Sequence, residues 1–179
     1  MRVISGTARG RKLKEPAGSD IRPTGDKVKE SMFNIIQFDI EGRRVLDLFA
    51  GTGQLGIEAL SRGARSVVFV DSKPEAVRLI RVNLELCGFT DSATVYARDA
   101  LKYPGGDETF DLIFIDPPYD SPLAGKALLR IIEFDKLNTN GIIVCESKAD
   151  YVLPDVPPPY FFHKEYLYGS VKITRYSRG

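Results

Sequence analysis

A short segment at residues 45–56, with the sequence VLDLFAGTGQLG, places the strongest constraint on the fold of this chain. Apolar side chains lead into Gly51-Thr52-Gly53, and a helix-forming run follows. This order predicts a buried strand, a tight turn and a helix, because glycine tolerates positive φ and lets a ligand approach the backbone. Open α/β sheets bind their ligands at such turns, beyond the carboxyl ends of their strands.

The glycine pattern alone does not identify the ligand. Gly51, Gly53 and Gly56 fit G-x-G-x-x-G, which dinucleotide-binding enzymes share and which a plain strand-to-helix turn can also contain. Asp47 sharpens the prediction, because a carboxylate inside an apolar strand is costly unless it is paired or orients another group. Asp71 ends the next apolar run and can accept hydrogen bonds from a ribose. An acid there suits NAD and S-adenosylmethionine (SAM) equally well.

Composition bounds the class of protein. The 179 residues predict one domain with a small appendage, which we divide into a basic N-terminal arm at residues 1–20 and a main domain at residues 21–179. The net charge is +1, so any nucleic-acid surface must come from local charge asymmetry. The two cysteines lack metal-binding or redox spacing, and we expect no metal. No apolar run is long enough to span a membrane, and no signal-peptide core is evident, so we expect a cytoplasmic protein that is not associated with a membrane. The sequence does not encode a readable oligomeric state, and a monomer is our working expectation.

The first 15 residues differ from the rest in charge. Five basic side chains precede the first acid, Glu15, and they are Arg2, Arg9, Arg11, Lys12 and Lys14. An arm of this kind can contact phosphates. It can equally be an edge hairpin whose charges prevent pairing between sheets, and charge alone leaves both readings open. Arg22 and Thr24 lie just before the next predicted helix, where they can contact substrate phosphate or hold the arm in place.

Strands alternate with helices along the main domain, which predicts an α/β fold with a doubly wound, mostly parallel sheet. The expected seven strands include a closing hairpin, and a direct hairpin cannot join parallel strands, so the last strand should be antiparallel. This arrangement favours a methyltransferase-type sheet over a simple dinucleotide-binding fold. The strands are expected near residues 45–49, 67–70, 93–97, 110–115, 142–145, 160–167 and 171–176.

The sequence Asp116-Pro117-Pro118-Tyr119 follows the fourth predicted strand and decides the chemistry. An exocyclic amine on a base is a poor nucleophile because its lone pair is delocalised into the ring. The Asp116 carboxylate and the Pro117 carbonyl can each accept a hydrogen bond from that amine, and two prolines hold these acceptors in place before reaction. Tyr119 offers a flat face for stacking the base.

Together these segments resemble the class I SAM-dependent amino-methyltransferases. More narrowly, the chain is similar over nearly its whole length to the bacterial 16S ribosomal RNA guanine-N2 methyltransferases of the RsmD type. The Arg-Pro-Thr segment and its helix are specific to that family, whereas the glycine turn and the Asp-Pro-Pro-Tyr loop are shared more widely. The resemblance rests on residues 6–13, 22–24, 27–34, 47–64, 116–119 and 168–169.

The resemblance implies SAM as the cofactor and folded 16S ribosomal RNA or an assembling small subunit as the partner. Asp71 would hold the ribose hydroxyls with Ser72 beside it, and Asp99 would accept from the adenine amine with Ala100 alongside. The SAM pocket would further be lined by Asp47, Ala50, Gly51 and Gly53. The target guanine would be presented by residues 116–119, and RNA would be contacted by Arg9, Arg11, Lys12, Arg22 and Thr24.

Other functions remain open at this point. The same loop serves DNA adenine-N6 and protein glutamine-N5 methylation, although Asp116 and the lack of a large target-recognition insertion favour RNA. An NAD-dependent oxidoreductase would leave the Asp-Pro-Pro-Tyr loop without a role. An RNA-binding module that has lost catalysis would bind SAM without methyl transfer. The single histidine, His163, lies in the closing hairpin and is interpreted as structural rather than catalytic.

Overall fold

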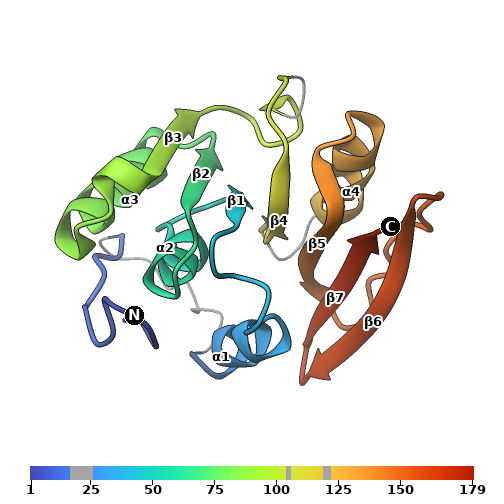
Figure 1. Ribbon diagram of the computed structural model, residues 1–179. Helices are drawn as coiled ribbons and strands as arrows, with labels where there is room; N and C mark the ends of the chain where they lie inside the picture. Colours follow the sequence, from blue (N-terminus) through green and yellow to red (C-terminus); the bar gives the residue numbers. More distant parts are fainter. Residues whose placement is uncertain (17–25, 104–105, 119–121) are drawn as a thin grey trace.

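The computed structural model describes residues 1–16, 26–103, 106–118 and 122–179 and shows a sheet with helices on both faces (Figure 1). The sheet has seven strands in the order β3-β2-β1-β4-β5-β7-β6. The strands are β1 (Arg44–Leu48), β2 (Ser66–Asp71), β3 (Ala93–Ala97), β4 (Phe110–Ile115), β5 (Leu137–Lys148), β6 (Tyr160–Tyr168) and β7 (Val171–Arg178). The helices are α1 (Asp26–Ile35), α2 (Gln54–Ser61), α3 (Pro74–Cys87), the 3-10 turn η1 (Thr90–Ser92) and α4 (Leu123–Glu133).

The pairing confirms the predicted mixed sheet. Strands β1 to β5 pair in parallel, and β7 pairs antiparallel with both β5 and β6. The strand order reverses between β1 and β4, so two crossover connections leave from neighbouring strands at this point. A doubly wound sheet binds its ligand at such a reversal, because the two connections diverge to opposite faces.

Alternating side chains of β1 build two separate cores. Val45 faces a cluster that includes Phe33 of α1, Leu60 of α2 and Ile80 of α3, whereas Leu46 faces a cluster that includes Leu128 of α4. Successive residues of a strand point to opposite faces, so an apolar strand in this position must be covered on both sides. The near-continuous apolar runs of β1, β2 and β4 follow from that double burial.

The start of the fifth strand differs from the sequence prediction. The fifth strand was expected at residues 142–145 after a turn at Asn140-Gly141, but β5 begins at Leu137. Its pairing with β4 passes directly from Leu137 to Ile142, so Asn140, with φ of 61°, lies in a bulge within the strand. A turn residue inside an apolar run can mark a bulge as well as a strand end, which is why the pattern misled.

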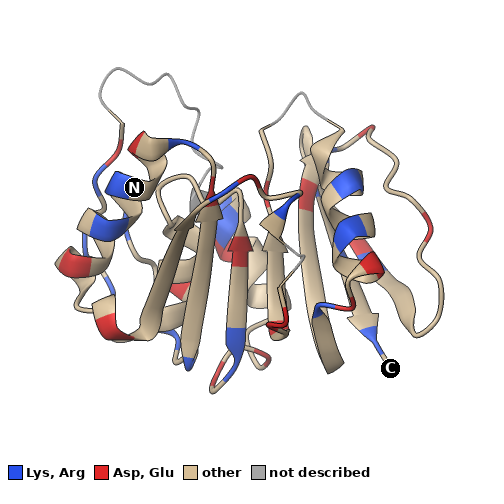
Figure 2. Ribbon diagram, turned by 90° about the horizontal axis from the view of Figure 1, so that it is seen from above, with Lys and Arg blue, Asp and Glu red and all other residues tan. Residues whose placement is uncertain are grey.

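Charge is distributed over the whole molecule. Figure 2 shows Lys and Arg alternating with Asp and Glu along the helices and at the strand ends, rather than covering one face. None of the helices in the described ranges has the length and apolar character needed to cross a bilayer. The predicted boundary at residue 20 between arm and main domain lies outside the described residues.

Candidate active site

The carboxyl ends of four neighbouring strands bring the predicted site residues to one edge of the sheet. Leu48 of β1 pairs with Val70 of β2 and with Ile115 of β4, and Asp71 of β2 pairs with Ala97 of β3. The segments that directly follow these strands therefore meet in a row. They carry Asp99 after β3, Asp71 and Ser72 at the end of β2, the glycine turn after β1, and Asp116 after β4.

The turn between β1 and α2 reverses the chain sharply. Phe49, Gly51 and Gly53 all have positive φ, at 61°, 57° and 79°. A non-glycine residue rarely adopts this conformation, so Phe49 marks a constrained backbone of the kind found at binding sites. A Cβ atom added to Gly51 would meet only the Phe49 carbonyl oxygen, at 3.9 Å. The turn therefore leaves room for a ligand against its backbone.

Asp71 holds the turn from the side of β2. One carboxylate oxygen accepts the amide N–H of Gly51 at 2.9 Å, and the other accepts that of Lys73 at 2.9 Å. This second bond holds the residue that precedes α3, which begins at Pro74 with Lys73 as N-cap and no side-chain cap bond. A carboxylate oxygen has more than one lone pair, so Asp71 can still accept from a ligand hydroxyl.

Asp47 is buried beneath the turn, with 1% of its surface exposed. Its carboxylate accepts the amide N–H of Gly56 in the first turn of α2 at 2.9 Å. Burial raises the pKa of Asp47 to about 8; the Gly56 bond opposes the rise, and the nearby charges of Asp116 and Asp71 add to it. The pairing of Leu48 with Val70 and with Ile115 brings these three acids, which the sequence predicted, to the same edge of the sheet.

Asp116 follows β4 directly and is partly exposed, while Pro117 behind it is buried. Desolvation raises the pKa of Asp116 to about 7, so its protonation changes near neutral pH. Tyr119, the last residue of the predicted motif, lies outside the described residues. At the other end of the row, exposed Asp99 accepts the Leu101 amide N–H at 2.8 Å, and Ala100 is buried beside it.

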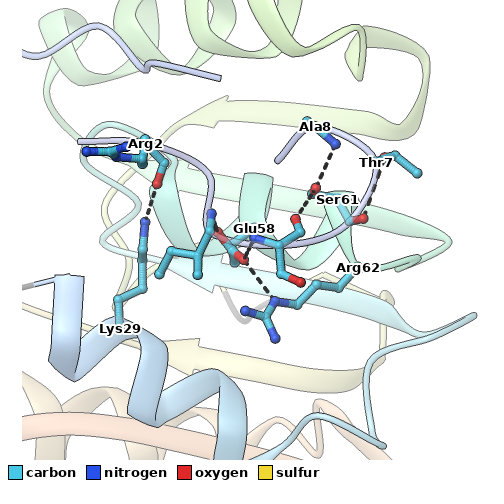
Figure 3. Close-up of polar contacts among 9 residues, drawn as sticks. Arg2, Thr7, Ala8, Lys29, Glu58, Ser61 and Arg62 are labelled. Carbon is cyan, nitrogen blue, oxygen red and sulfur yellow. Dashed lines mark hydrogen bonds and ion pairs between the residues drawn. The ribbon is translucent and has the colours of Figure 1, made fainter. Parts of the chain in front are cut away.

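The N-terminal arm lies across α2 and is fixed there by buried polar groups (Figure 3). The Glu58 carboxylate, fully buried, accepts the amide N–H groups of Ile4 at 2.7 Å and Ser5 at 3.0 Å. The Ser61 hydroxyl donates to the Ser5 carbonyl at 2.5 Å and accepts the Ala8 amide N–H at 2.9 Å. The arm is thus anchored through its backbone, which leaves its basic side chains available.

The residues predicted to contact RNA divide into two groups. Arg9, Arg11 and Lys12 are exposed, and none of them forms an ion pair within the described part of the chain. Arg22 and Thr24 lie outside the described residues.

His163 is exposed on β6, beyond β7 and away from the row of strand ends. The described residues contain no group of three or more His, Cys, Asp or Glu side chains arranged to hold a metal ion.

Sequence reasoning missed the polar residues that attach the arm. Glu58, Asn83 and Lys29 are fully buried, and the Lys29 amine donates to the Arg2 carbonyl at 2.8 Å. A charged or amide side chain on the apolar face of a helix is the available signal, because burial is costly without a partner. For Glu58, the sequence QLGIEALS places the acid within an apolar run.

The fold and the row of acids beside the glycine turn define a methyltransferase. The chain belongs to the family described as conserved hypothetical protein 95, whose model matches residues 1–177.

Relatives and solved structures agree with this class. The chain is 44% identical over 183 residues to "Putative rRNA methyltransferase YlbH" of Bacillus subtilis, covering 99% of both chains. It is 36% identical over 180 residues to "Ribosomal RNA small subunit methyltransferase D" of Haemophilus influenzae, covering 98% of this chain and 93% of that protein. A solved structure from Escherichia coli, "Putative methyltransferase yhhF", has a TM-score of 0.87 and 31% identity and covers 99% of this chain and 97% of that one.

Proposed function

We propose that this protein transfers a methyl group from SAM to the exocyclic N2 of a guanine in 16S ribosomal RNA. The observation that carries the proposal is the adjacency of β1 and β4, where Leu48 pairs with Ile115. That register places the glycine turn and the Asp116-Pro117-Pro118 segment side by side. The relatives named small-subunit ribosomal RNA methyltransferases support the substrate class, since the similarity covers nearly the whole of both chains.

The residues at the turn fit SAM. The open space against Gly51 suits the close approach of a ligand, and Asp71 lies next to it with lone pairs for ribose hydroxyls. Asp99 would accept from the adenine amine at the next strand end, with Ser72, Ala50 and Ala100 alongside. When bound, SAM supplies an electrophilic methyl group. The protein supplies position and hydrogen bonds.

Asp116 and Pro117 prepare the guanine amine. The carboxylate of Asp116 and the carbonyl of Pro117 would accept its two N–H groups, which favours the geometry with a localised lone pair. This role needs Asp116 ionised, and its raised pKa of about 7 also allows it to take up the proton that the amine loses. Tyr119 would stack on the base, which is worth ~1–3 kcal/mol.

The N-terminal arm would contact the RNA backbone. Its exposed Arg9, Arg11 and Lys12 project from a backbone that Glu58 and Ser61 hold against α2, so the charges are placed before RNA arrives. Arg22 and Thr24 would extend this contact. We further propose that the partner is 16S RNA or the assembling small subunit, and that the enzyme acts as a monomer in the cytoplasm.

Methyl transfer from labelled SAM tests the proposal. Small-subunit RNA with its assembling proteins, naked 16S RNA, duplex DNA and a protein extract would be offered in parallel, and the products digested and identified. We expect N2-methylguanosine from the ribosomal substrate, and no product with Asp116→Ala, which should retain its SAM affinity. Label in DNA or protein would overturn the substrate, and SAM binding without any transfer would favour a binding module.

A further inference from the structure

Asn83 of α3 satisfies every hydrogen-bonding group of its side-chain amide, although it is fully buried. Its oxygen accepts the Lys14 amide N–H at 2.7 Å. Its nitrogen donates to the Lys14 carbonyl at 3.1 Å and to the Thr52 carbonyl at 2.9 Å. The opposite orientation of the amide would face its oxygen toward two carbonyls, so the donors and acceptors fix one arrangement.

These bonds join two segments that are distant in the sequence. Lys14 belongs to the N-terminal arm, and Thr52 lies between the two glycines of the turn. The arm also contacts Thr52 directly, because the Thr52 hydroxyl lies 3.6 Å from the Met1 sulfur. The neighbouring Gly51 amide is bonded to Asp71. Hydrogen bonds therefore link the arm to Asn83 and Asn83 to the turn, and the backbone of the turn leads from Thr52 to Gly51, which is bonded to the acid at the end of β2.

Core packing alone does not explain this asparagine. A buried amide is unfavourable unless it is fully bonded, and an apolar residue of similar size would pack in α3 without that requirement. Its loss would leave the backbone groups of Lys14 and Thr52 without these partners, which is unfavourable where water cannot replace them. Asn83 thus holds the arm and the turn through the same side chain.

We propose that Asn83 is a positioning residue that couples the N-terminal arm to the glycine turn, so that RNA on the arm and SAM at the turn favour each other's binding. Such a coupling is reciprocal, because an RNA that raises the affinity of the turn for SAM must have its own affinity for the arm raised by SAM by the same factor. The RNA half of this inference rests on the proposed function. The half that concerns the arm and the turn can be tested without RNA.

Hydrogen exchange of the arm measures the coupling directly. In the unaltered protein, saturating S-adenosylhomocysteine should slow amide exchange in residues 3–14 by about fivefold or more, although the ligand binds at the turn. Asn83→Asp keeps an acceptor for the Lys14 amide but loses both donated bonds. In this variant the amides of the arm should exchange equally fast with and without S-adenosylhomocysteine. Val82→Ala, an exposed neighbour on α3, is the matched control and should behave like the unaltered protein.

A second pair of variants guards against general damage to α3. Lys14→Pro removes the backbone N–H that Asn83 accepts, while Lys14→Ala removes the same side chain and keeps that N–H. The ligand-dependent protection of residues 3–13 should be lost in the proline variant and kept in the alanine variant. The inference would be overturned if the ligand protected the arm equally in the proline and alanine variants. It would also be overturned if the ligand did not slow exchange of the arm in the unaltered protein, or if the protection persisted in Asn83→Asp.

The RNA half has its own readout. The dissociation constant of S-adenosylhomocysteine should fall about fivefold or more when 16S RNA is saturating, and the two values should become equal in Asn83→Asp. If the unaltered protein bound no ribosomal RNA, the proposed function would fail while the exchange result still stood. If RNA bound without changing the ligand affinity of the unaltered protein, the coupling would fail and the proposed function would remain.

Discussion

The carboxylate of Asp47 accepts the amide N–H of Gly56 at 2.9 Å, and this bond ties the strand below the turn to the helix above it. The two residues lie in β1 and α2, with the whole glycine turn between them. A neutral carboxyl group can accept the same bond, so the contact does not require Asp47 to be charged. Its buried position and its acidic neighbours make the neutral form the favoured one at pH 7.

Asp47→Asn should remove a pH dependence of stability. The pKa of Asp47 is raised from 3.8 to about 8 in the folded protein, so ionisation destabilises the fold, and stability is lost as pH rises from about 4 to 8. The free energy of unfolding of the unaltered protein should fall relative to that of the variant by up to about 1.4 kcal/mol per pH unit in this window. Urea unfolding of both proteins at several pH values between 5 and 9 measures the difference. If the free energies of unfolding of the two proteins changed with pH in parallel, the raised pKa would not belong to Asp47.

Gly56→Ala should destabilise the fold by packing rather than by backbone strain. An added Cβ would lie 2.2 Å from the Phe69 ring and 2.8 Å from a Val67 methyl group, so α2 could not stay this close to β2. We expect a loss of about 1–3 kcal/mol in the free energy of unfolding, measured with urea. Gly106→Ala is the control, because its Cβ would meet no atom within 4 Å, and it should change stability by less than about 0.5 kcal/mol.

The activity should depend on the ionisation of Asp116. Desolvation raises its pKa to about 7, and only the carboxylate form can take up the proton that the guanine amine loses in the proposed role, so kcat/KM should fall about tenfold per pH unit below pH 7. Asp116→Asn retains an oxygen acceptor but does not titrate in this range. Its profile should be lower and flat, whereas a falling limb that survives in this variant would assign the titration to another group.

The fold could be predicted from the sequence because each strand and turn is indicated by a pattern of only a few neighbouring residues. The apolar runs ending in Asp71 and in Asp116 each signal a buried parallel strand, and a hairpin near Gly169 forces one antiparallel strand. Asn140 misled the prediction of the fifth strand, since a bulge and a turn use the same residue types.

The attachment of the arm could not be predicted in the same way. Asn83 and Lys14 are 69 positions apart, and neither stands out until the fold brings them together. The acids of the site were easier to recognise, because strand ends meet at one edge in any sheet of this topology. Roles assigned to Asp99, Ser72 and the arm's arginines came from family resemblance and remain predictions.

Removing charge from the arm should weaken RNA binding in a salt-dependent way. Arg9 and Arg11 are exposed, and replacing both with Ala should reduce the slope of log affinity against log salt by about 1.5 to 2. Filter binding of 16S RNA over a range of salt concentrations measures the slope. The control is the replacement of Lys126 and Lys164, which are exposed on α4 and β6, because it removes the same two positive charges away from the arm. An unchanged slope in the arm variant would make the arm a structural element only.

Gly6 determines whether the arm can lie on α2. It has φ of 81°, and an added Cβ would lie 1.7 Å from the Ser61 carbonyl oxygen, which is backbone and cannot move aside. Gly6→Ala should therefore lift the arm from the helix and break the Thr7 amide bond to Ser61, now 2.8 Å long. Limited digestion with trypsin should then cleave at Arg9 and Arg11 much faster than in the unaltered protein.

The control for this variant lies in the same arm. Gly10 has φ of 84°, yet an added Cβ would meet no atom within 4 Å, so Gly10→Ala carries the backbone strain without the collision. If strain alone opened the arm, both variants would be cleaved equally fast. Faster cleavage of Gly6→Ala would instead locate the anchor at the contact with α2, where Glu58 and Ser61 bind the arm's backbone.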